Sequence, residues 1–374
     1  MNKEKLFNIL KNSAAVVVIA AMFVVIFYQN RDRDIFKFGK EESSKFISAS
    51  QDTAEGFSGG DIARLREGVA FLTTTSYCVL DENAQGESVP IAMSEPQLHT
   101  EDDYAACYNL DSREVTVFKK NIVIYTVKTD NKILRAKVNK NGYLFVATEK
   151  EGYNCECLVY NRKGEAIFKW DVSKSEFLDG DINCSNNAIA ISLAAAGNKK
   201  LVGEVSLIDI TDAEIIKKET FDSEIFYNLN FNNNDTYTLL GNRSLTYFNS
   251  DGTKRWSHNF GKDTLLKADV SNHDMMVVAF ASSSGIIEGS STKIQIINRL
   301  GKVTAQKNFD SVIDDIAIND DSIALVFGKK VYVTNAALKE RKTFYADYSI
   351  KKSALFDDGK HLFVLGNSGG KILK

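Results

Sequence analysis

The chain has 374 residues, of which 44% are hydrophobic and 25% are charged, and its formal net charge is -3. This composition is typical of a folded globular protein and excludes an intrinsically disordered chain. The 46 basic and 49 acidic residues are interspersed, so no part of the chain makes the sustained positive surface that nucleic acid binding requires.

The first predicted element is an uncharged apolar run over residues 13–28, with lysines before it and Arg31 and Arg33 after it. As an α-helix this run covers about 24 Å, somewhat less than the hydrocarbon core of a bilayer, and polar residues at its ends can lie at the interfaces. It lacks the small-residue cleavage pattern of a signal peptide. We predict a transmembrane signal anchor at residues 13–29; a cleaved signal peptide and a buried helix are the alternatives.

The anchor divides the chain into a tail at residues 1–12 and everything that follows. Lys and Arg are almost equally frequent on both sides, so the positive-inside rule barely decides the orientation. A short tail before a whole domain is the usual layout of an anchor that sends its C-terminal part outward. We expect a cytoplasmic tail, a juxtamembrane linker at 30–56 and an extracytoplasmic domain on a single-pass protein of the cell membrane.

Residues 57–374 repeat one pattern of short strands and polar turns, rich in Val, Ile, Thr, Tyr and Phe. The second strand of each unit is predicted to begin near Val69, Tyr104, Tyr143, Ala188, Thr236, Met275, Ser322 and His361. These starts lie about 42 residues apart on average, which is the period of a four-stranded propeller blade. We predict an all-β, eight-bladed β-propeller; seven blades are the alternative, because the first unit is irregular.

The last unit, from about residue 350, holds only three strand-like segments. An open sheet edge in the ring would invite aggregation, so we expect a strand from the N-terminal part of the chain to complete this unit. The first candidate is DIFKFGK at 34–40, and the second is SKFISAS at 44–50.

Several units close on Asn, a Gly three residues later and, in two units, a tryptophan. The segments are YNRKGEAIFKW at 160–170, FNSDGTKRW at 248–256 and, without tryptophan, INRLGKV at 297–303. They resemble blades of the PQQ-like (quinoprotein-type) propeller superfamily, in which a tryptophan near each blade's end packs on the neighbouring blade. The resemblance implies that one set of residues docks the blades: Trp170, Trp256, Gly164, Gly252 and Gly301.

The layout of one N-terminal span followed by such repeats is similar to a family of uncharacterised bacterial membrane-anchored propeller proteins of unknown function. The resemblance covers about 320 residues, as expected for some eight units of propeller length. It implies an architecture and no activity.

Motifs that carry chemistry are few. No GxSxG motif, P-loop or dinucleotide fingerprint occurs, and the four histidines lack metal-ligand spacing. Cys155-Glu-Cys157 has no further ligand nearby in sequence, and the paired acids lie where turns favour Asp. A quinone enzyme would carry adjacent cysteines, which this chain lacks. We predict no catalytic residue, no cofactor and no metal site.

The sequence favours a non-enzymatic protein-interaction scaffold at the cell envelope, with another envelope protein or a cell-wall polymer as partner. The alternative is a propeller that binds carbohydrate or another small ligand through aromatic side chains exposed on one face. The candidates are Tyr104, Tyr108, Tyr153 and either Phe226 or Tyr227. A quinone-dependent or hydrolytic enzyme is the third possibility, and it would bring polar side chains together at the mouth of the channel.

Overall fold

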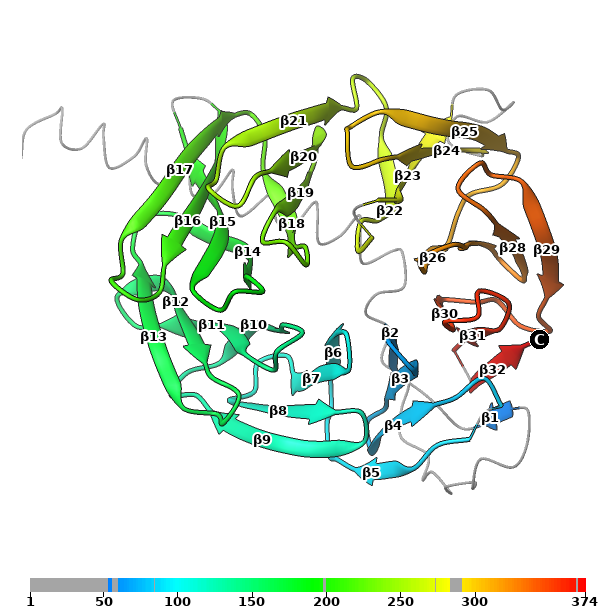
Figure 1. Ribbon diagram of the computed structural model, residues 1–374, viewed down its shortest axis with the longest axis horizontal. Coiled ribbons are helices and arrows are strands. Elements are labelled where there is room, and N and C mark those ends of the chain that lie inside the picture. The colour runs from blue at the N-terminus through cyan, green and yellow to red at the C-terminus, as the bar shows by residue number, and fades with distance from the viewer. Residues whose placement is uncertain are drawn as a thin grey trace, which may run out of the picture.

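The computed structural model describes residues 53–55, 60–83, 85–197, 200–272, 274–282, 291–367 and 369–374. The strands in these residues form eight four-stranded antiparallel sheets. The sheets stand around a central axis as blades, each with one strand innermost (Figure 1). The prediction of eight blades is confirmed, and the seven-bladed alternative is wrong.

Blades 1 to 4 follow one another along the chain, and each runs from its inner to its outer strand. Blade 1 holds β2 (Asp61–Leu65), β3 (Gly68–Leu72), β4 (Ser76–Leu80) and β5 (Ser88–Pro90). Blade 2 holds β6 (Pro96–Glu101), β7 (Tyr104–Asn109), β8 (Glu114–Lys119) and β9 (Ile122–Lys128). Blade 3 holds β10 (Ile133–Val138), β11 (Leu144–Lys150), β12 (Tyr153–Tyr160) and β13 (Ala166–Val172). Blade 4 holds β14 (Glu176–Ile182), β15 (Ala188–Ala196), β16 (Leu201–Asp209) and β17 (Ile215–Asp222).

Blades 5 to 7 repeat this order, and blade 8 closes the ring. Blade 5 holds β18 (Phe226–Phe231), β19 (Tyr237–Gly241), β20 (Ser244–Phe248) and β21 (Lys254–Asn259). Blade 6 holds β22 (Leu265–Asp269), β23 (Met276–Ser282), β24 (Ser291–Ile297) and β25 (Val303–Phe309). Blade 7 holds β26 (Asp315–Ile318), β27 (Ile323–Phe327), β28 (Lys330–Thr334) and β29 (Glu340–Tyr345). Blade 8 holds β30 (Lys352–Leu355), β31 (Leu362–Leu365), β32 (Gly369–Leu373) and β1 (Thr53–Glu55).

The second strand of each blade begins within one residue of its predicted position. Strands such as β3, β19 and β27 are buried along their whole length. Both faces of a blade are covered by its neighbours, so these strands read as continuous apolar runs rather than as an alternation. This explains why their hydrophobic stretches were the clearest signal in the sequence.

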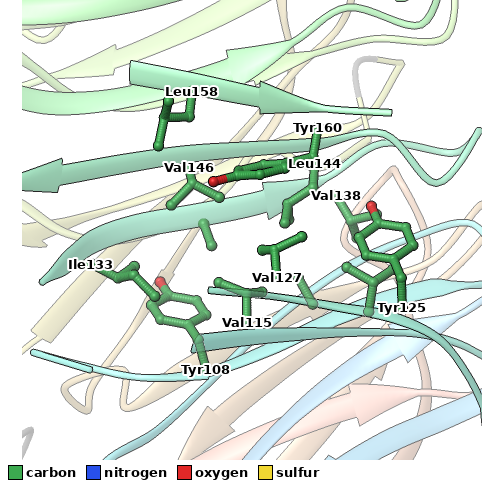
Figure 2. Close-up of a cluster of buried hydrophobic side chains, with 13 residues drawn as sticks. Tyr108, Val115, Tyr125, Val127, Ile133, Val138, Leu144, Val146, Leu158 and Tyr160 are labelled. Carbon is green, nitrogen blue, oxygen red and sulfur yellow. The ribbon is translucent and has the colours of Figure 1, made fainter. Parts of the chain in front are cut away.

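The core is divided into clusters that lie between neighbouring blades. In one of them, Tyr108 and Val115 of blade 2 pack with Val138, Val146 and other residues of blade 3 (Figure 2). Each blade thus has no core of its own and is stabilised by its neighbours. The ring must be complete for its last blade to be covered.

An N-terminal strand closes the ring, as predicted, but its residues differ from both candidates. β1 pairs with β32 in antiparallel register, with Ala54 opposite Gly370. The choice of 34–40 or 44–50 is therefore wrong for this position, and both segments lie outside the described residues. The predicted tail and anchor also lie outside them; the part of the chain that the structure describes has no helix long and apolar enough to cross a membrane.

Candidate functional site

Trp256 of β21 lies against the next blade. Its ring faces Gly301 in the turn before β25, where an added Cβ would lie 2.6 Å from the indole. The indole Nε1–H donates a hydrogen bond of 2.9 Å to the Arg299 carbonyl, and the ring stacks on Tyr247 at a centroid distance of 5.4 Å. Trp256 is only half-buried. It bridges blades 5 and 6 at the rim of the propeller.

The other proposed docking residues make related but unequal contacts. Gly164 receives the ring of Tyr125 from β9, and Gly252 receives the side-chain stem of Lys217 from β17. Trp170 packs on the apolar cluster between blades 3 and 4. It follows its turn glycine by six residues, whereas Trp256 follows its own by four. The two tryptophans therefore do not occupy equivalent positions.

Two of the aromatic candidates lie between blades rather than on a surface. Tyr108 is only 3% exposed and belongs to the cluster between blades 2 and 3 (Figure 2). Tyr104 is half-buried and packs on the same cluster, with its ring against Gly142. The expectation that Tyr108 is exposed is wrong, because β7 is covered on both faces.

The remaining two aromatic candidates are exposed but belong to different blades. Tyr153 begins β12 and is 44% exposed, with the Lys150 ammonium 4.8 Å from the ring centroid. Tyr227 lies on the inner strand β18 and is 43% exposed, whereas its neighbour Phe226 is fully buried. The four candidates therefore do not form one aromatic face of the kind that a sugar-binding propeller would present.

The inner strands instead carry polar side chains at matching levels around the central axis of the ring. Asp61, Asp179 and Asp315 each accept the backbone N–H of a residue on the next inner strand, and these bonds fix the register between blades. In this register every blade places one polar residue at the same level. This first belt consists of Asp61, Gln97, Arg135, Asp179, Asn228, Lys267, Asp315 and Lys352.

A second belt lies two residues further along the same strands. It includes His99, Lys137, Asp181, Asn230 and Asp269. Here too the side chains accept backbone N–H groups of the next blade, from Val138 to His99 Nδ1 and from Phe231 to Asp181. The two belts therefore link neighbouring blades through side-chain-to-backbone hydrogen bonds.

A buried network of ion pairs and hydrogen bonds within the belts joins three blades. Lys137 of blade 3 is 1% exposed, and its ammonium donates to the Asp179 carboxylate at 2.8 Å and to the Leu229 carbonyl of blade 5. Arg135 adds a second ion pair to Asp179 at 3.1 Å. Burial by itself would raise the pKa of Asp179, but Lys137 and Arg135 outweigh burial and lower it. Blades 3 to 5 are thus tied together through one buried carboxylate.

The pKa values of three other acids on the inner strands are shifted in the opposite direction, upward. Burial raises the pKa of Glu101 to about 7, and the nearby charges of Asp181 and Asp102 add to this effect. Burial likewise raises the pKa of Asp181 and of Asp315 to about 6, against the opposing effect of cations and hydrogen bonds. These acids are protonated more readily in the folded protein than in water.

The imidazole of His99 is held neutral by its surroundings. Burial, followed by the charges of Lys137 and Arg135, lowers its pKa to about 3. Neutral imidazole leaves Nδ1 free to accept the N–H of Val138. This histidine therefore acts as a fixed link between blades 2 and 3.

The cysteines and acids do not come together in a metal centre. No group of three or more His, Cys, Asp or Glu residues that could hold a metal ion occurs within the described ranges. Cys155 and Cys157 are both buried on β12, in the cluster between blades 3 and 4. Their surroundings are apolar.

The sequence interpretation missed both belts. Taken one at a time, acids such as Asp61 and Asp179 look like ordinary strand or turn residues. An alignment of the eight units on their second strands would have shown a polar residue recurring near the start of every inner strand. That recurrence is the signal for polar links between neighbouring inner strands.

A family model described as a family of unknown function, DUF5711, matches residues 49–373. A sequence search of curated proteins finds no match. Among solved structures, the C-terminal WD40 domain of Sif2 is similar with a TM-score of 0.59 and 12% identity, covering 88% of this chain and 99% of that domain. BamB from Moraxella catarrhalis gives 0.53 and 10%, covering 83% and 95%, and a eukaryotic initiation factor gives 0.54 and 14%, covering 86% and 83%. At these identities the likeness shows the propeller fold alone.

Proposed function

The chain belongs to this family of unknown function, and on that premise we propose that it is a membrane-anchored, extracytoplasmic propeller that serves as a non-enzymatic scaffold for other envelope proteins. β-Propellers commonly bind other proteins, and function on such scaffolds belongs to their exposed surfaces. The acids of the inner strands accept hydrogen bonds from neighbouring blades. They therefore have a structural role in holding the ring together, which favours a scaffold over an enzyme.

The observation that carries the proposal is the outer strand of blade 2. β9 is a sheet edge and exposes three consecutive apolar side chains, Ile122 at 68%, Val123 at 46% and Ile124 at 40%. Its one charged residue, Lys128, is its last. The outer strands β13, β17, β21 and β29 each carry at least two charged residues, whereas β25 carries one and the three-residue β5 none.

Charged residues on an edge strand discourage pairing with another chain. β9 lacks this protection, and its apolar side chains would gain from being covered. We infer that an extended apolar segment of another envelope protein pairs with the β9 edge by strand addition.

This surface is tested by crosslinking in the native membrane. A photoreactive residue in place of Ile124 should capture a protein partner, whereas the same residue in place of Lys342 on β29 should not. Ile122→Lys should abolish capture with little change in stability, because the position is exposed. Equal capture from both positions, or no loss with Ile122→Lys, would show that β9 is not the partner site.

The anchor is the second part of the proposal and is supported by the uncharged apolar run at residues 13–28. Full-length protein should sediment with membranes and resist extraction by alkaline carbonate, and removal of residues 1–29 should release it. Protease added outside intact spheroplasts should digest the propeller if it is extracytoplasmic. Protection of the propeller in that assay would place it in the cytoplasm.

The kinship with PQQ-like propellers is also part of the proposal. It is supported by the recurring Asn-x-x-Gly turns and by the contact of Trp256 with Gly301 on the next blade. A Trp256→Ala variant as stable as the wild type would contradict it.

A further inference from the structure

Three aromatic side chains form a row from the junction of blades 6 and 7 to the molecular surface. Phe309, the last residue of β25, and Tyr332 of β28 are half-buried, and their ring centroids lie 5.6 Å apart. Tyr345 ends β29 and is 71% exposed, the largest fraction among the large hydrophobic side chains of the described residues. β25 and β29 both lie on the outside of the ring (Figure 1).

The sheet register places this aromatic row on one face of blade 7. Lys330 of β28 lies directly opposite Phe327 on one side and Tyr345 on the other. Tyr332 follows Lys330 by two residues, and residues two apart on a strand share a face. This face is turned toward blade 6, because Phe309 stacks on Phe327 at a centroid distance of 4.9 Å.

Two lysines lie over the rings of the aromatic row. The Lys330 ammonium is 4.2 Å from the ring centroid of Tyr332 and 5.5 Å from that of Tyr345. The Lys307 ammonium is 5.2 Å from the ring centroid of Phe309. Neither ammonium forms an ion pair with an acid in the part of the chain that the structure describes. Their positive charge is therefore not neutralised by the protein.

Another exposed tyrosine with a lysine beside its ring shows the contrast. The Lys150 ammonium lies 4.8 Å from the ring centroid of Tyr153, but it is paired with both Glu156 and Asp171. The aromatic row differs from that surface in combining an exposed ring with cations that have no acidic partner.

This combination fits a sugar that carries a negative charge. An exposed aromatic ring offers a flat apolar face, and the C–H groups on one side of a sugar ring can pack against it. Ammonium groups bind carboxylates through charge-assisted hydrogen bonds. A sugar acid provides both contacts in one residue of the polymer.

Two other anionic partners fit this surface less well. A peptide that added a strand to the β29 edge would meet Glu340, Arg341 and Lys342, whose charges discourage strand pairing. Nucleic acid binding requires a broader positive surface than two lysines, and the net charge of the chain is -3.

We propose that Tyr345, Lys330 and Lys307 form a binding site for an acidic polysaccharide, with a sugar ring stacked on Tyr345 and the sugar carboxylates bound by the two lysines. Tyr332 and Phe309 connect this site to the junction between the blades. The inference goes beyond the scaffold proposal. It depends neither on the membrane anchor nor on the β9 surface, so a negative crosslinking result at β9 would leave it unaffected.

The test measures the fluorescence anisotropy of hexagalacturonate, labelled at its reducing end, as full-length protein in detergent is added. Each sugar of this probe carries one carboxylate, and we expect saturable binding. The methyl ester of the same oligosaccharide keeps the rings and loses the charge, so it should bind at least about tenfold more weakly. Absence of saturable binding, or equal binding of the ester, would overturn the proposal.

Variants locate the binding. Tyr345→Ala should weaken it by about tenfold, because the stacking ring is lost. Lys330→Gln should weaken it by about tenfold or more, because a charge-assisted hydrogen bond is lost, and Lys330→Arg should retain it. The controls are Tyr153→Ala, at an exposed tyrosine of blade 3, and Lys342→Gln, on the opposite face of β29. Both should bind as the wild type does.

Two further probes separate ring stacking from charge. Hexaglutamate carries carboxylates without sugar rings, and hexadeoxythymidylate carries phosphates and bases. Both should bind at least about tenfold more weakly than hexagalacturonate, and equal binding of either would overturn the proposal in favour of a peptide or a nucleic acid site. The proposal also fails if Tyr345→Ala or Lys330→Gln, with an unchanged melting temperature, binds hexagalacturonate as tightly as the two controls.

Discussion

At the scale of single residues, the contact between Trp256 and Gly301 depends on what glycine lacks. Gly301 has φ +75° and faces the indole with no side chain between them. Gly261 has a similar φ of +65°, but no atom lies within 4 Å of the place where its Cβ would be. The two glycines separate the effect of backbone conformation from that of contact.

We predict that Gly301→Ala destabilises the protein more than Gly261→Ala does. Both variants carry the cost of a left-handed backbone, about 1–2 kcal/mol. Only Gly301→Ala also displaces Trp256, which adds about 1–3 kcal/mol. Urea unfolding measures both values, and combining Gly301→Ala with Trp256→Ala should recover part of the loss. Equal effects of the two alanines would show that the contact adds nothing.

Trp256→Ala should cost about 1–3 kcal/mol in the free energy of unfolding, less than the 3–5 kcal/mol typical of a fully buried tryptophan, because the side chain is half-buried. Trp256→Phe should cost about 1 kcal/mol, since it keeps the aromatic contact and loses the hydrogen bond to Arg299. Unfolding curves that superimpose on the wild type would remove the docking role of this residue.

Glu101 should make stability fall as pH rises. At pH well below 4.5 the carboxyl is protonated in both states and has no effect. Between its usual pKa of 4.5 and its raised value of about 7, the folded protein holds the proton more firmly, so stability is lost as pH rises, and the loss is complete above about 7.

Glu101→Gln should therefore reduce the drop in melting temperature between pH 5 and pH 8. Asp181 and Asp315, with pKa values raised to about 6, contribute in the same direction, so part of the drop should remain. Glu214→Gln, at an exposed turn, is the control and should leave the pH profile unchanged. An unchanged profile in Glu101→Gln would show that its carboxyl is not held protonated by the fold.

At the scale of elements, the inner strands β10, β14 and β18 are joined by Lys137 and Asp179. Lys137→Met leaves a buried carboxylate short of one partner, although Arg135 remains. We expect a loss of about 3–5 kcal/mol. Lys128→Met removes the exposed pair with Glu114 and should cost about 0–1 kcal/mol. Similar small losses in both variants would mean that the three blades are held by apolar packing alone.

The elements also show what could be predicted from the sequence. Second strands are largely apolar because both of their faces are covered, and this strong local signal predicted the positions of all eight. β1 has only three residues, and its place beside β32 depends on a contact more than 300 residues away in the chain. No local pattern specifies such a strand, and the longer aromatic segments at 34–40 and 44–50 were the more obvious choices.

The candidate site was harder to predict for a related reason. Lys137 and Asp179 become a pair only when the ring places their strands side by side, and each is ordinary in its own segment. The exposure of the aromatic candidates was not predicted correctly, because the repeat period of the sequence does not say which face of a strand the neighbouring blade covers. Tyr108 and Tyr227 are both strand tyrosines, yet one is 3% and the other 43% exposed.

At the scale of the whole molecule, ring closure depends on β1. Its three residue pairs with β32 cover the last edge of blade 8, and ion pairs from Lys352 to Asp61 and from Arg64 to Asp357 join blades 8 and 1 nearer the channel. Without β1, the backbone groups of β32 would form an exposed edge that could pair with another chain.

We predict that a chain starting at residue 60 is less stable than one starting at residue 49, by about 1–3 kcal/mol for the loss of the short ladder. It should also associate at concentrations where the longer chain is monomeric, because β32 then lacks its cover. Both chains lack residues 13–29, so a difference in unfolding midpoint or in sedimentation reports on residues 49–59, which contain β1. A peptide of residues 50–59 should restore the monomer by adding the strand in trans. If the two chains unfold and sediment alike, the ion pairs between blades 8 and 1 suffice to close the ring.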